Sequence, residues 1–311
     1  MKIFNKQNIN LLYWILNKPF GIIAIRSYTF QKWNKIKNFN IGDDLNFYML
    51  RKLTGKRIIN YNDMRKPRFN ITHYTCIGSV FEWEVDSASI VWGTGSMYGG
   101  LKQFIKPQKI CAVRGPLTRK ALINQGIPCP EVYGDPALLL PLVYKPHVNK
   151  KYKIGLIPHY VDCNLSSVKS FCNKYENKIL LIHMQNYNNW KEVVDDICSC
   201  ECTASSSLHG MIISDAYNIP NVWIRLSDNI AGGDFKYLDY LASVERVETT
   251  PVDFRNKDIS IECLKMKLKG YHHIMIDISA LIQSCPFINE RRRKELLNDV
   301  PKSYPFLSGS N

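Results

Sequence analysis

Extended apolar runs alternate with amphipathic helical patterns along most of this 311-residue chain. The stretch Ile22 to Thr29 is typical of a strand, and a helix from Leu45 to about Leu53 follows it, with Asp43 as its N-cap. Repeated alternation of this kind is typical of βαβ units, whose strands lie parallel in a sheet covered by helices. The sequence therefore predicts an α/β protein with parallel sheets.

The alternation continues on both sides of a polar, proline-containing stretch, Lys145 to Lys153, which has the composition of an interdomain linker. Further strands are expected at 75–77, 89–92, 110–113, around 132, at 154–157, 179–182, from 200 and at 222–224, and helices at 167–175, 190–197, after 209, after 234, at 261–269 and at 290–297. The chain is long enough for two domains that each bury a core. We expect domains at 1–147 and 148–311, with the last helix packing back on the first domain.

Positive charge dominates the composition: 41 Lys and Arg against 27 Asp and Glu give a formal net charge of +14. Such an excess favours an anionic partner, which leaves nucleic acid, anionic lipid or a phosphorylated small molecule to consider. The basic residues are spread along the chain, without an RNP-like or zinc-finger pattern. Nucleic acid is therefore not an expected partner.

The ten cysteines are too few and too irregularly spaced for a disulfide scaffold, and no signal peptide opens the sequence. We therefore expect a reducing compartment, the cytoplasm. Cys198, Cys200 and Cys202 alternate along a predicted strand and lack both Cys-x-x-Cys geometry and a partner pair. No metal site is predicted from them.

The apolar patches between Asn8 and Ile25 are interrupted by Asn17, Lys18 and Pro19. This segment is too short and too broken to span a bilayer. Two interpretations remain open for its first helix: it rests on an anionic membrane surface as an amphipathic helix, or it packs on the core of the protein.

Several predicted strands end in a polar or charged group: Arg114, Asp135, His159, His183, the turn Ser205 to His209, and Arg225. The carboxyl ends of parallel strands meet at one edge of a sheet, where ligands bind. His209 is the most informative of these residues because a helical pattern follows it directly, and the N–H groups of a helix N-terminus attract anions. The alternative is a capping turn with a structural histidine.

Arg114 precedes a proline that suits the first position of a helix, so its side chain is expected at another helix N-terminus. Arg119, one turn later, is expected to be solvated or salt-bridged. A glycine turn, Gly93-Thr94-Gly95-Ser96, follows a predicted strand and is a weak phosphate-loop signal by itself. Arginines, helix N-termini and a histidine together suit a small phosphate- or carboxylate-bearing donor.

Two other chemistries are not favoured by the same residues. Glycoside hydrolysis needs a pair of carboxylates across the scissile bond, and no such pair stands out. Acyl transfer by Ser205 to Ser207 would call for a Gly-x-Ser-x-Gly elbow, which the sequence lacks.

The order and spacing of seven motifs, over most of the chain, resemble those of the polysaccharide pyruvyl transferases: 40–46 NIGDDLN, 93–96 GTGS, 114–118 RGPLT, 134–136 GDP, 157–159 IPH, 206–210 SSLHG and 236–240 KYLDY. The resemblance implies two Rossmann-like domains arranged as in GT-B glycosyltransferases, with the active site in the interdomain cleft. It also implies transfer of the pyruvyl unit of phosphoenolpyruvate onto two hydroxyls of a sugar, which leaves a cyclic ketal and phosphate. Phosphoenolpyruvate is then a co-substrate, and no cofactor is expected.

Carried over position by position, the resemblance makes His209 the general acid and places Arg114, Ser206, Ser207 and Leu208 around the donor. Well-known members of the family have an arginine where this chain has Ser207, so Arg225 and Lys236 are candidates for the missing positive charge. The cleft or acceptor side is expected to comprise Asn40, Asp43, Gly95, Ser96, Asp135 and His159.

The expected acceptor is a surface-polysaccharide precursor, carried on a lipid at the inner face of the membrane. Two alternatives stay open. A GT-B glycosyltransferase would use a nucleotide sugar, and a non-catalytic protein would dock on a glycan or membrane without needing His209 for chemistry.

Overall fold

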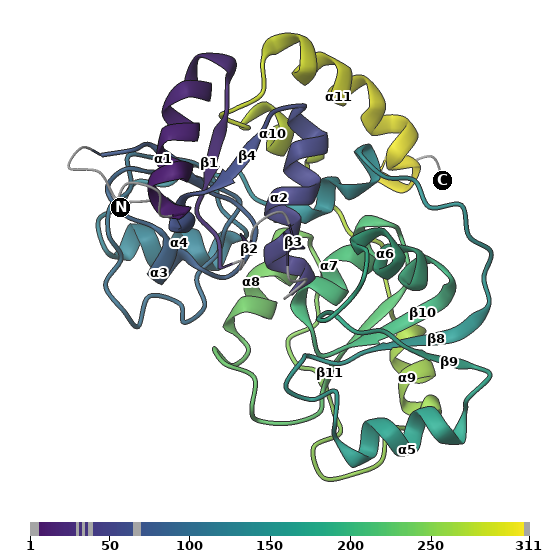
Figure 1. Cartoon of the computed structure of the whole chain (residues 1–311). Helices are drawn as coiled ribbons and strands as arrows, with labels where there is room; N and C mark the ends of the chain where they lie inside the picture. The colour runs from purple at the N-terminus through teal and green to yellow at the C-terminus, as the bar shows by residue number, and fades with distance from the viewer. Residues whose placement is uncertain (1–5, 29–30, 33–34, 37–39, 65–69, 308–311) are drawn as a thin grey trace.

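The computed structural model describes residues 6–28, 31–32, 35–36, 40–64 and 70–307. Its framework is a pair of five-stranded parallel sheets (Figure 1). The first contains β1 (Ile23–Ile25), β4 (Ile58–Asn60), β5 (His73–Thr75), β6 (Ser89–Trp92) and β7 (Lys109–Ala112). The second contains β8 (Tyr152–Ile157), β9 (Ile179–Leu181), β10 (Cys200–Ser205), β11 (Asn221–Arg225) and β12 (Val252–Asp253). The predicted α/β architecture with two parallel sheets is confirmed.

Both sheets have the same topology. Their spatial orders are β4-β1-β5-β6-β7 and β12-β11-β10-β8-β9. Counted in chain order within each sheet, this is 2-1-3-4-5 in both, the doubly wound order in which ligands bind where the strand order reverses. The reversal lies between β1 and β5 in the first sheet and between β8 and β10 in the second.

Helices cover the faces of the sheets. The first half contributes α1 (Lys6–Asn17), α2 (Ile41–Thr54), α3 (Phe81–Glu84) and α4 (Pro116–Asn124), and the 3-10 helix η3 (Pro136–Leu142) follows them. The second half contributes α5 (Ser166–Lys174), α6 (Trp190–Cys198), α7 (Leu208–Ala216), α8 (Phe235–Ser243), α9 (Ile261–Leu268), α10 (Ile278–Gln283) and α11 (Glu290–Ser303). No helix in the described part of the chain has the length and apolar character needed to cross a membrane.

Helix α2 begins four residues earlier than the sequence predicts. Its N-cap is Asn40, whose side chain accepts a hydrogen bond from the Gly42 N–H, and not Asp43, which lies in the first turn. Asn40 takes the extended backbone conformation typical of an N-cap, so the helix starts at Ile41. Gly55 ends the helix in the left-handed conformation, as expected of a C-terminal glycine.

The end of the chain returns to the first sheet. The Trp92 indole N–H donates to the Leu281 carbonyl in α10 at 3.1 Å, and the Arg292 Nε in α11 donates to the Leu53 carbonyl at 2.8 Å. One buried hydrophobic cluster accordingly runs through both halves, from Ile23 near the N-terminus to Tyr304. The two sheets lie on either side of the predicted boundary at 147 and 148, which stays a prediction.

Strand boundaries differ from the predicted ones in interior strands as well as at the sheet edges. The strand predicted at 75–77 is β5, which covers His73–Thr75. β6 matches its prediction, whereas the strand predicted at 22–29 covers Ile23–Ile25, and Thr29 lies outside the described residues. The strand expected around Val132 is a single bridge between Val113 and Tyr133. β4 and β12 were not predicted because edge strands of three and two residues carry too little hydrophobic pattern to be recognised.

Candidate active site

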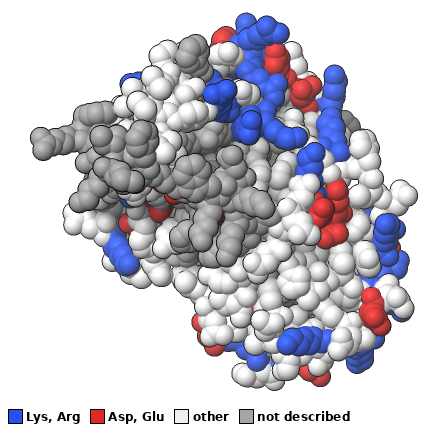
Figure 2. All heavy atoms as spheres, viewed as in Figure 1, with Lys and Arg blue, Asp and Glu red and all other residues white. Residues whose placement is uncertain are grey.

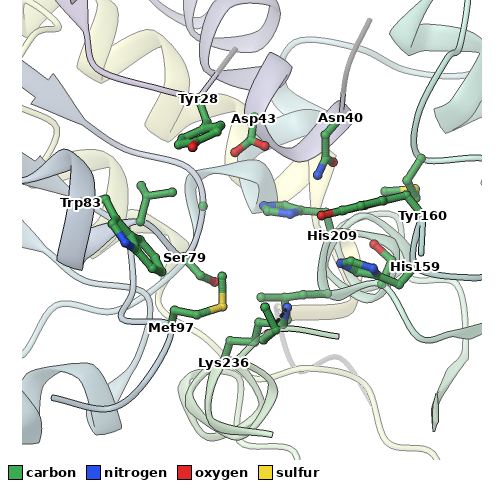
Figure 3. Close-up of a pocket in the computed structure, with 16 residues that line it drawn as sticks. Tyr28, Asn40, Asp43, Ser79, Trp83, Met97, His159, Tyr160, His209 and Lys236 are labelled. Carbon is green, nitrogen blue, oxygen red and sulfur yellow. Dashed lines mark hydrogen bonds between the residues drawn. The ribbon is translucent and has the colours of Figure 1, made fainter. Parts of the chain in front are cut away.

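A cavity of about 390 Å³ opens where the two halves of the chain face each other (Figure 3). Eight lining residues come from the first half (Tyr28, Asn40, Asp43, Gly78, Ser79, Val80, Trp83, Met97) and eight from the second (His159, Tyr160, Met184, Ser207, Leu208, His209, Ala231, Lys236). Tyr28 and Ser79 follow β1 and β5, and His159 and His209 follow β8 and β10. The cavity therefore lies at the strand-order reversal of both sheets, where doubly wound folds bind ligands.

His209 is held at the start of α7 by close packing and by an acidic neighbour. Its Nε2 lies 3.6 Å from Oδ2 of Asp135, and both atoms are buried without a hydrogen-bond partner in the described structure. A separation of 3.6 Å is too long for a hydrogen bond. The other carboxylate oxygen of Asp135 accepts from the Ala137 N–H, which fixes the carboxylate at the start of η3.

The His209 ring also packs closely against a glycine, Gly42. A Cβ on Gly42 would lie 2.2 Å from His209 Nδ1, so the backbone of α2 approaches the imidazole more closely than any side chain allows. The ring is thus confined between Gly42 and Asp135, with 13% of the side chain exposed. Confinement of this kind fixes the orientation of a proton-transferring group before a ligand arrives.

Positive potential on the second-half wall has two sources. Ser207, the N-cap of α7, makes no side-chain capping hydrogen bond, so the N–H groups of the first turn of α7 are not used by that hydroxyl. Lys236, 5% exposed, donates to the Ala231 carbonyl at 3.2 Å. Burial, with a smaller contribution from the charge of Arg114, lowers the pKa of Lys236 to about 8. Lys236 therefore remains mostly charged at neutral pH.

His159 is neutral at physiological pH. Burial, reinforced by the charge of Lys236, lowers the pKa of its imidazole to about 3. Its backbone N–H donates to Ser206 Oγ at 2.8 Å, and its ring lies 4.3 Å from that of Tyr160. His159 thus lines the cavity as expected, as a neutral hydrogen-bonding group.

Asp43 is the acidic side chain on the first-half wall. Burial raises the pKa of its carboxyl to about 6, against the opposing effect of His209, and the neighbouring Asp44, Glu84 and Asp135 raise it further. A carboxyl with a pKa near 6 exchanges protons readily at neutral pH. Figure 3 shows Asp43 on the same side of the cavity as Asn40, with His209 facing both.

Arg114 does not line the cavity, in contrast to the sequence-based expectation. Its guanidinium is fully buried and bonds to Asp239 Oδ2 at 2.9 Å, to the Ser96 carbonyl at 2.7 Å and to the Ser79 hydroxyl. A Cβ on Gly95 would lie 2.3 Å from its Cζ. Arg114 therefore joins the two halves of the chain. It acts on the cavity through its charge near Lys236 and its hydrogen bond to the lining residue Ser79.

Other expected site residues also have structural partners. Arg225 pairs with Asp234 and lines a separate hollow, so of the two candidates for the missing charge the structure places Lys236 at the cavity. Ser206 is fully buried, and its hydroxyl accepts from the His159 N–H and donates to Asp162. His183 is exposed and does not line the cavity.

Two further polar side chains are used locally. The Ser96 hydroxyl bonds to the Glu82 carboxylate, and Ser96 is fully buried. Arg119 forms an ion pair with Glu131 at 2.9 Å, as expected for a salt-bridged surface residue. The thiols of Cys200 and Cys202 donate to backbone carbonyls, and the described residues include no group of three His, Cys, Asp or Glu arranged to hold a metal ion.

Sequence reasoning missed the aromatic and apolar part of the lining, above all Tyr28, Trp83, Met97 and Tyr160. These residues lie in short connections or on the four-residue helix α3, where no periodic pattern marks them. Gly42 was recognised as part of a motif, but its contact with His209, 167 positions away, is set by tertiary packing.

Comparisons with known proteins identify a family for this chain. The family described as polysaccharide pyruvyl transferase matches residues 2–228. The succinoglycan biosynthesis protein ExoV of Rhizobium meliloti (strain 1021) is 28% identical over 173 residues, which are 53% of this chain and 52% of that protein. An uncharacterized protein of Acanthamoeba polyphaga mimivirus is 28% identical over 221 residues, 67% of this chain and 71% of its own length.

The matched range contains His209, Asp43, Arg114 and His159, and it ends before Lys236. A match over more than half of the chain shows the family directly, and the fold and the motif order are consistent with it. The chain belongs to the polysaccharide pyruvyl transferase family.

Proposed function

We propose that this chain transfers the pyruvyl unit of phosphoenolpyruvate onto two hydroxyls of a saccharide, with release of phosphate. One observation carries the proposal: His209 stands at the N-terminus of α7 in a cavity that also contains Lys236. A proton donor, a helix N-terminus and an ammonium group thus face one space of about 390 Å³. This combination suits a compact ligand that carries both a phosphate and a carboxylate.

The reaction begins with protonation of the enol. His209 donates a proton to the methylene carbon of phosphoenolpyruvate, and the neighbouring carbon becomes an oxocarbenium-like centre. The oxygen of one acceptor hydroxyl bonds to that carbon, and its proton passes to a carboxylate. General acid catalysis of this kind contributes about 10²- to 10⁴-fold to the rate.

Closure of the ketal releases phosphate. The bond from the former enol carbon to the phosphate oxygen breaks, and the electron pair leaves with the phosphate. The second hydroxyl oxygen bonds to the same carbon, and its proton returns to the His209 imidazole. The proton taken up from the first hydroxyl passes to the departing phosphate, which restores the carboxylate. We assign Asp43 as the carboxylate that accepts the first hydroxyl proton, because it lines the cavity opposite His209 and has a pKa near 6.

The donor is held on the second-half wall. Lys236 and the first turn of α7 supply positive potential to the phosphate and carboxylate, and Ser207 supplies a hydroxyl where well-known family members have an arginine. Phosphoenolpyruvate is a co-substrate in this scheme, and no further cofactor is proposed. The acceptor then occupies the first-half wall near Asn40 and Asp43, and the two domains are arranged as in GT-B enzymes.

We propose as acceptor a surface-polysaccharide precursor carried on a lipid at the cytoplasmic face of a membrane. Four apolar residues of α1, spaced as one helical stripe, face solvent: Ile9 (36% exposed), Leu12 (56%), Tyr13 (39%) and Leu16 (62%). Trp14 packs inward at 7%. Arg57, which donates to the Tyr13 hydroxyl, and the exposed Lys18 border the stripe. An apolar stripe edged by cations fits an anionic lipid surface.

Positive charge also gathers on a second helix, α11. Figure 2 shows Lys and Arg side chains gathered over α11, which lies, like α1, at the top of the view in Figure 1. The side chain of Arg291 in α11 is 89% exposed. Basic residues close to a membrane add about 1 kcal/mol each to binding when the lipids are anionic.

Thermal-shift measurements separate this function from its two alternatives. The proposal predicts stabilisation by phosphoenolpyruvate and little by nucleotide sugars, because binding to the folded state alone raises the melting temperature. Stabilisation by nucleotide sugars alone would favour a GT-B glycosyltransferase. Stabilisation by glycans, with neither donor bound, would favour a non-catalytic docking protein.

A further inference from the structure

The first half of the chain lines the cavity with an aromatic and apolar wall formed by Tyr28, Val80, Trp83 and Met97. Figure 3 shows Tyr28 and Trp83 on one side, away from His159 and Tyr160 on the other. The cavity thus has two different sides. The side with Lys236 and the start of α7 suits an anion, and the side with Tyr28 and Trp83 is aromatic and apolar. The proposed function places phosphoenolpyruvate on the charged side and leaves the aromatic side unassigned.

Trp83 is unusual for its exposure. It is 40% exposed, whereas the other tryptophans in the described ranges (Trp14, Trp92, Trp190 and Trp223) are at most 7% exposed. Tyr28 is 58% exposed at the same cavity. Two large aromatic side chains therefore keep much of their surface available at the cavity wall, although such surface is favourably buried elsewhere in this protein.

The helix that carries Trp83 is anchored on both sides of this residue. The Glu82 carboxylate accepts from the Met97 and Tyr98 N–H groups at 3.0 and 3.1 Å, and the Glu84 carboxylate lies 2.9 Å from Arg26 Nε. The Tyr98 ring meets the indole edge-on at 5.7 Å. Trp83 is therefore fixed before any ligand binds, so little conformational entropy is lost on binding.

We propose that Trp83 and Tyr28 form the subsite for a hexopyranose ring of the acceptor, which stacks its C–H face on the aromatic rings. This inference rests on the proposed function and names the residues that recognise its acceptor. The C–H bonds of a sugar ring carry partial positive charge, and the face of an aromatic ring is the negative end of its quadrupole. A sugar therefore matches a flat aromatic surface that is partly open to water.

Polar groups line the same cavity as this surface: Asn40, Asp43 and Ser79. Figure 3 shows Asp43 between Tyr28 and His209, with Asn40 beside it. Ring hydroxyls project around the edge of a pyranose, so a sugar stacked on Trp83 directs hydroxyls toward these groups. The subsite thus presents acceptor hydroxyls to Asp43, which receives the first proton in the proposed reaction.

Intrinsic fluorescence tests this assignment without any reaction. Trp83 is the exposed tryptophan among those described, so a sugar that stacks on it changes the emission. The probes are short synthetic oligosaccharides of glucose and of galactose, with uridine and adenosine diphosphates in parallel arms. We expect saturable changes with at least one saccharide in the wild type and none in Trp83→Phe. Saturable changes with the diphosphates alone would overturn the sugar assignment.

Steady-state kinetics provides the second readout. Trp83→Ala is expected to raise the KM for the saccharide roughly tenfold and to leave the KM for phosphoenolpyruvate unchanged, while Trp83→Phe retains most of the affinity. Leu101→Ala is the matched control, because Leu101 is 87% exposed and does not line the cavity. An unchanged saccharide KM in Trp83→Ala would overturn the inference.

The two proposals fail in different ways. Saccharide binding that depends on Trp83, without turnover of phosphoenolpyruvate, would leave the subsite standing and contradict the proposed reaction. Turnover that is indifferent to Trp83→Ala would support the reaction and remove the subsite.

Discussion

Arg114 and Asp239 form a fully buried ion pair, with Nε 2.9 Å from Oδ2, that joins the first half of the chain to α8 in the second. Both oxygens of Asp239 also accept hydrogen bonds from Thr118, at 2.8 Å from its N–H and 2.7 Å from its hydroxyl. Lys236 lies one helical turn earlier on α8 and lines the cavity. The Arg114–Asp239 ion pair, which connects the two halves, thereby helps to position Lys236, the residue proposed to bind phosphoenolpyruvate.

Removal of Arg114 should destabilise the protein. Loss of one partner from a buried ion pair leaves an uncompensated charge, so Arg114→Met is expected to lower the free energy of unfolding by about 3–5 kcal/mol. Urea denaturation measures this change. The double variant Arg114→Met with Asp239→Leu should recover part of the loss. A stable Arg114→Met with a higher KM for phosphoenolpyruvate would instead show that Arg114 binds the donor directly.

Donor affinity should fall at alkaline pH. The pKa of Lys236 is lowered to about 8, so its ammonium is present below that pH and is lost above it. An anionic donor favours the charged form, and the KM for phosphoenolpyruvate is expected to rise as the pH increases through the range above 8. Lys236→Met should raise that KM about 10- to 100-fold at pH 7 and flatten its pH profile above 8. If the KM of Lys236→Met for phosphoenolpyruvate rises above pH 8 as it does in the wild type, Lys236 is not the group that binds the donor.

A single methyl group on Gly42 should disturb His209. Because its Cβ would lie 2.2 Å from Nδ1, Gly42→Ala must displace either the imidazole or the start of α2. A shift of about 1 Å in a catalytic group can cost 10²-fold in kcat, and we expect a loss of that order. Gly270→Ala is the control, because its nearest neighbour would lie 3.7 Å from the new Cβ. If Gly42→Ala and Gly270→Ala have the same kcat, the position of the His209 ring does not limit the reaction, and the prediction is wrong.

The exposed stripe of α1 should govern binding to anionic membranes. Leu12 and Leu16 are 56% and 62% exposed, so replacing both with serine removes apolar surface that the fold does not bury. Sedimentation with phosphatidylserine-containing vesicles should show binding weakened at least tenfold. Val247→Ser with Met266→Ser, at side chains that are 81% and 70% exposed elsewhere, is the matched control. If both double variants bind as the wild type does, α1 is not the docking surface.

The two histidines of the second-half wall were predictable because each follows the end of a strand. His159 and His209 follow β8 and β10, and the parallel order of the sheet brings those ends together. Arg114 and Arg225 also lie at strand ends, but each forms an ion pair with an aspartate and does not line the cavity. Asp239 lies 125 positions from Arg114, so their pairing depends on how the halves pack and leaves no local signal in the sequence.

The aromatic wall was not predictable for a related reason. Trp83 lies on the four-residue helix α3, and Tyr28 lies in the connection after β1. Neither position has the periodicity that identifies a helix or strand face. Their place in the same cavity as His209 depends on both sheets meeting at the ends where their strand orders reverse, which follows from topology and not from spacing along the chain.

The central claim is that His209 protonates phosphoenolpyruvate within this cavity. The direct measurement incubates the wild type and His209→Ala with phosphoenolpyruvate and saccharide acceptors, and follows phosphate release together with a pyruvyl mass gain on the acceptor. The account predicts both signals in equal amounts for the wild type and a loss of at least about 10²-fold in His209→Ala, with phosphoenolpyruvate binding retained. Pyruvyl transfer at the wild-type rate by His209→Ala would contradict it.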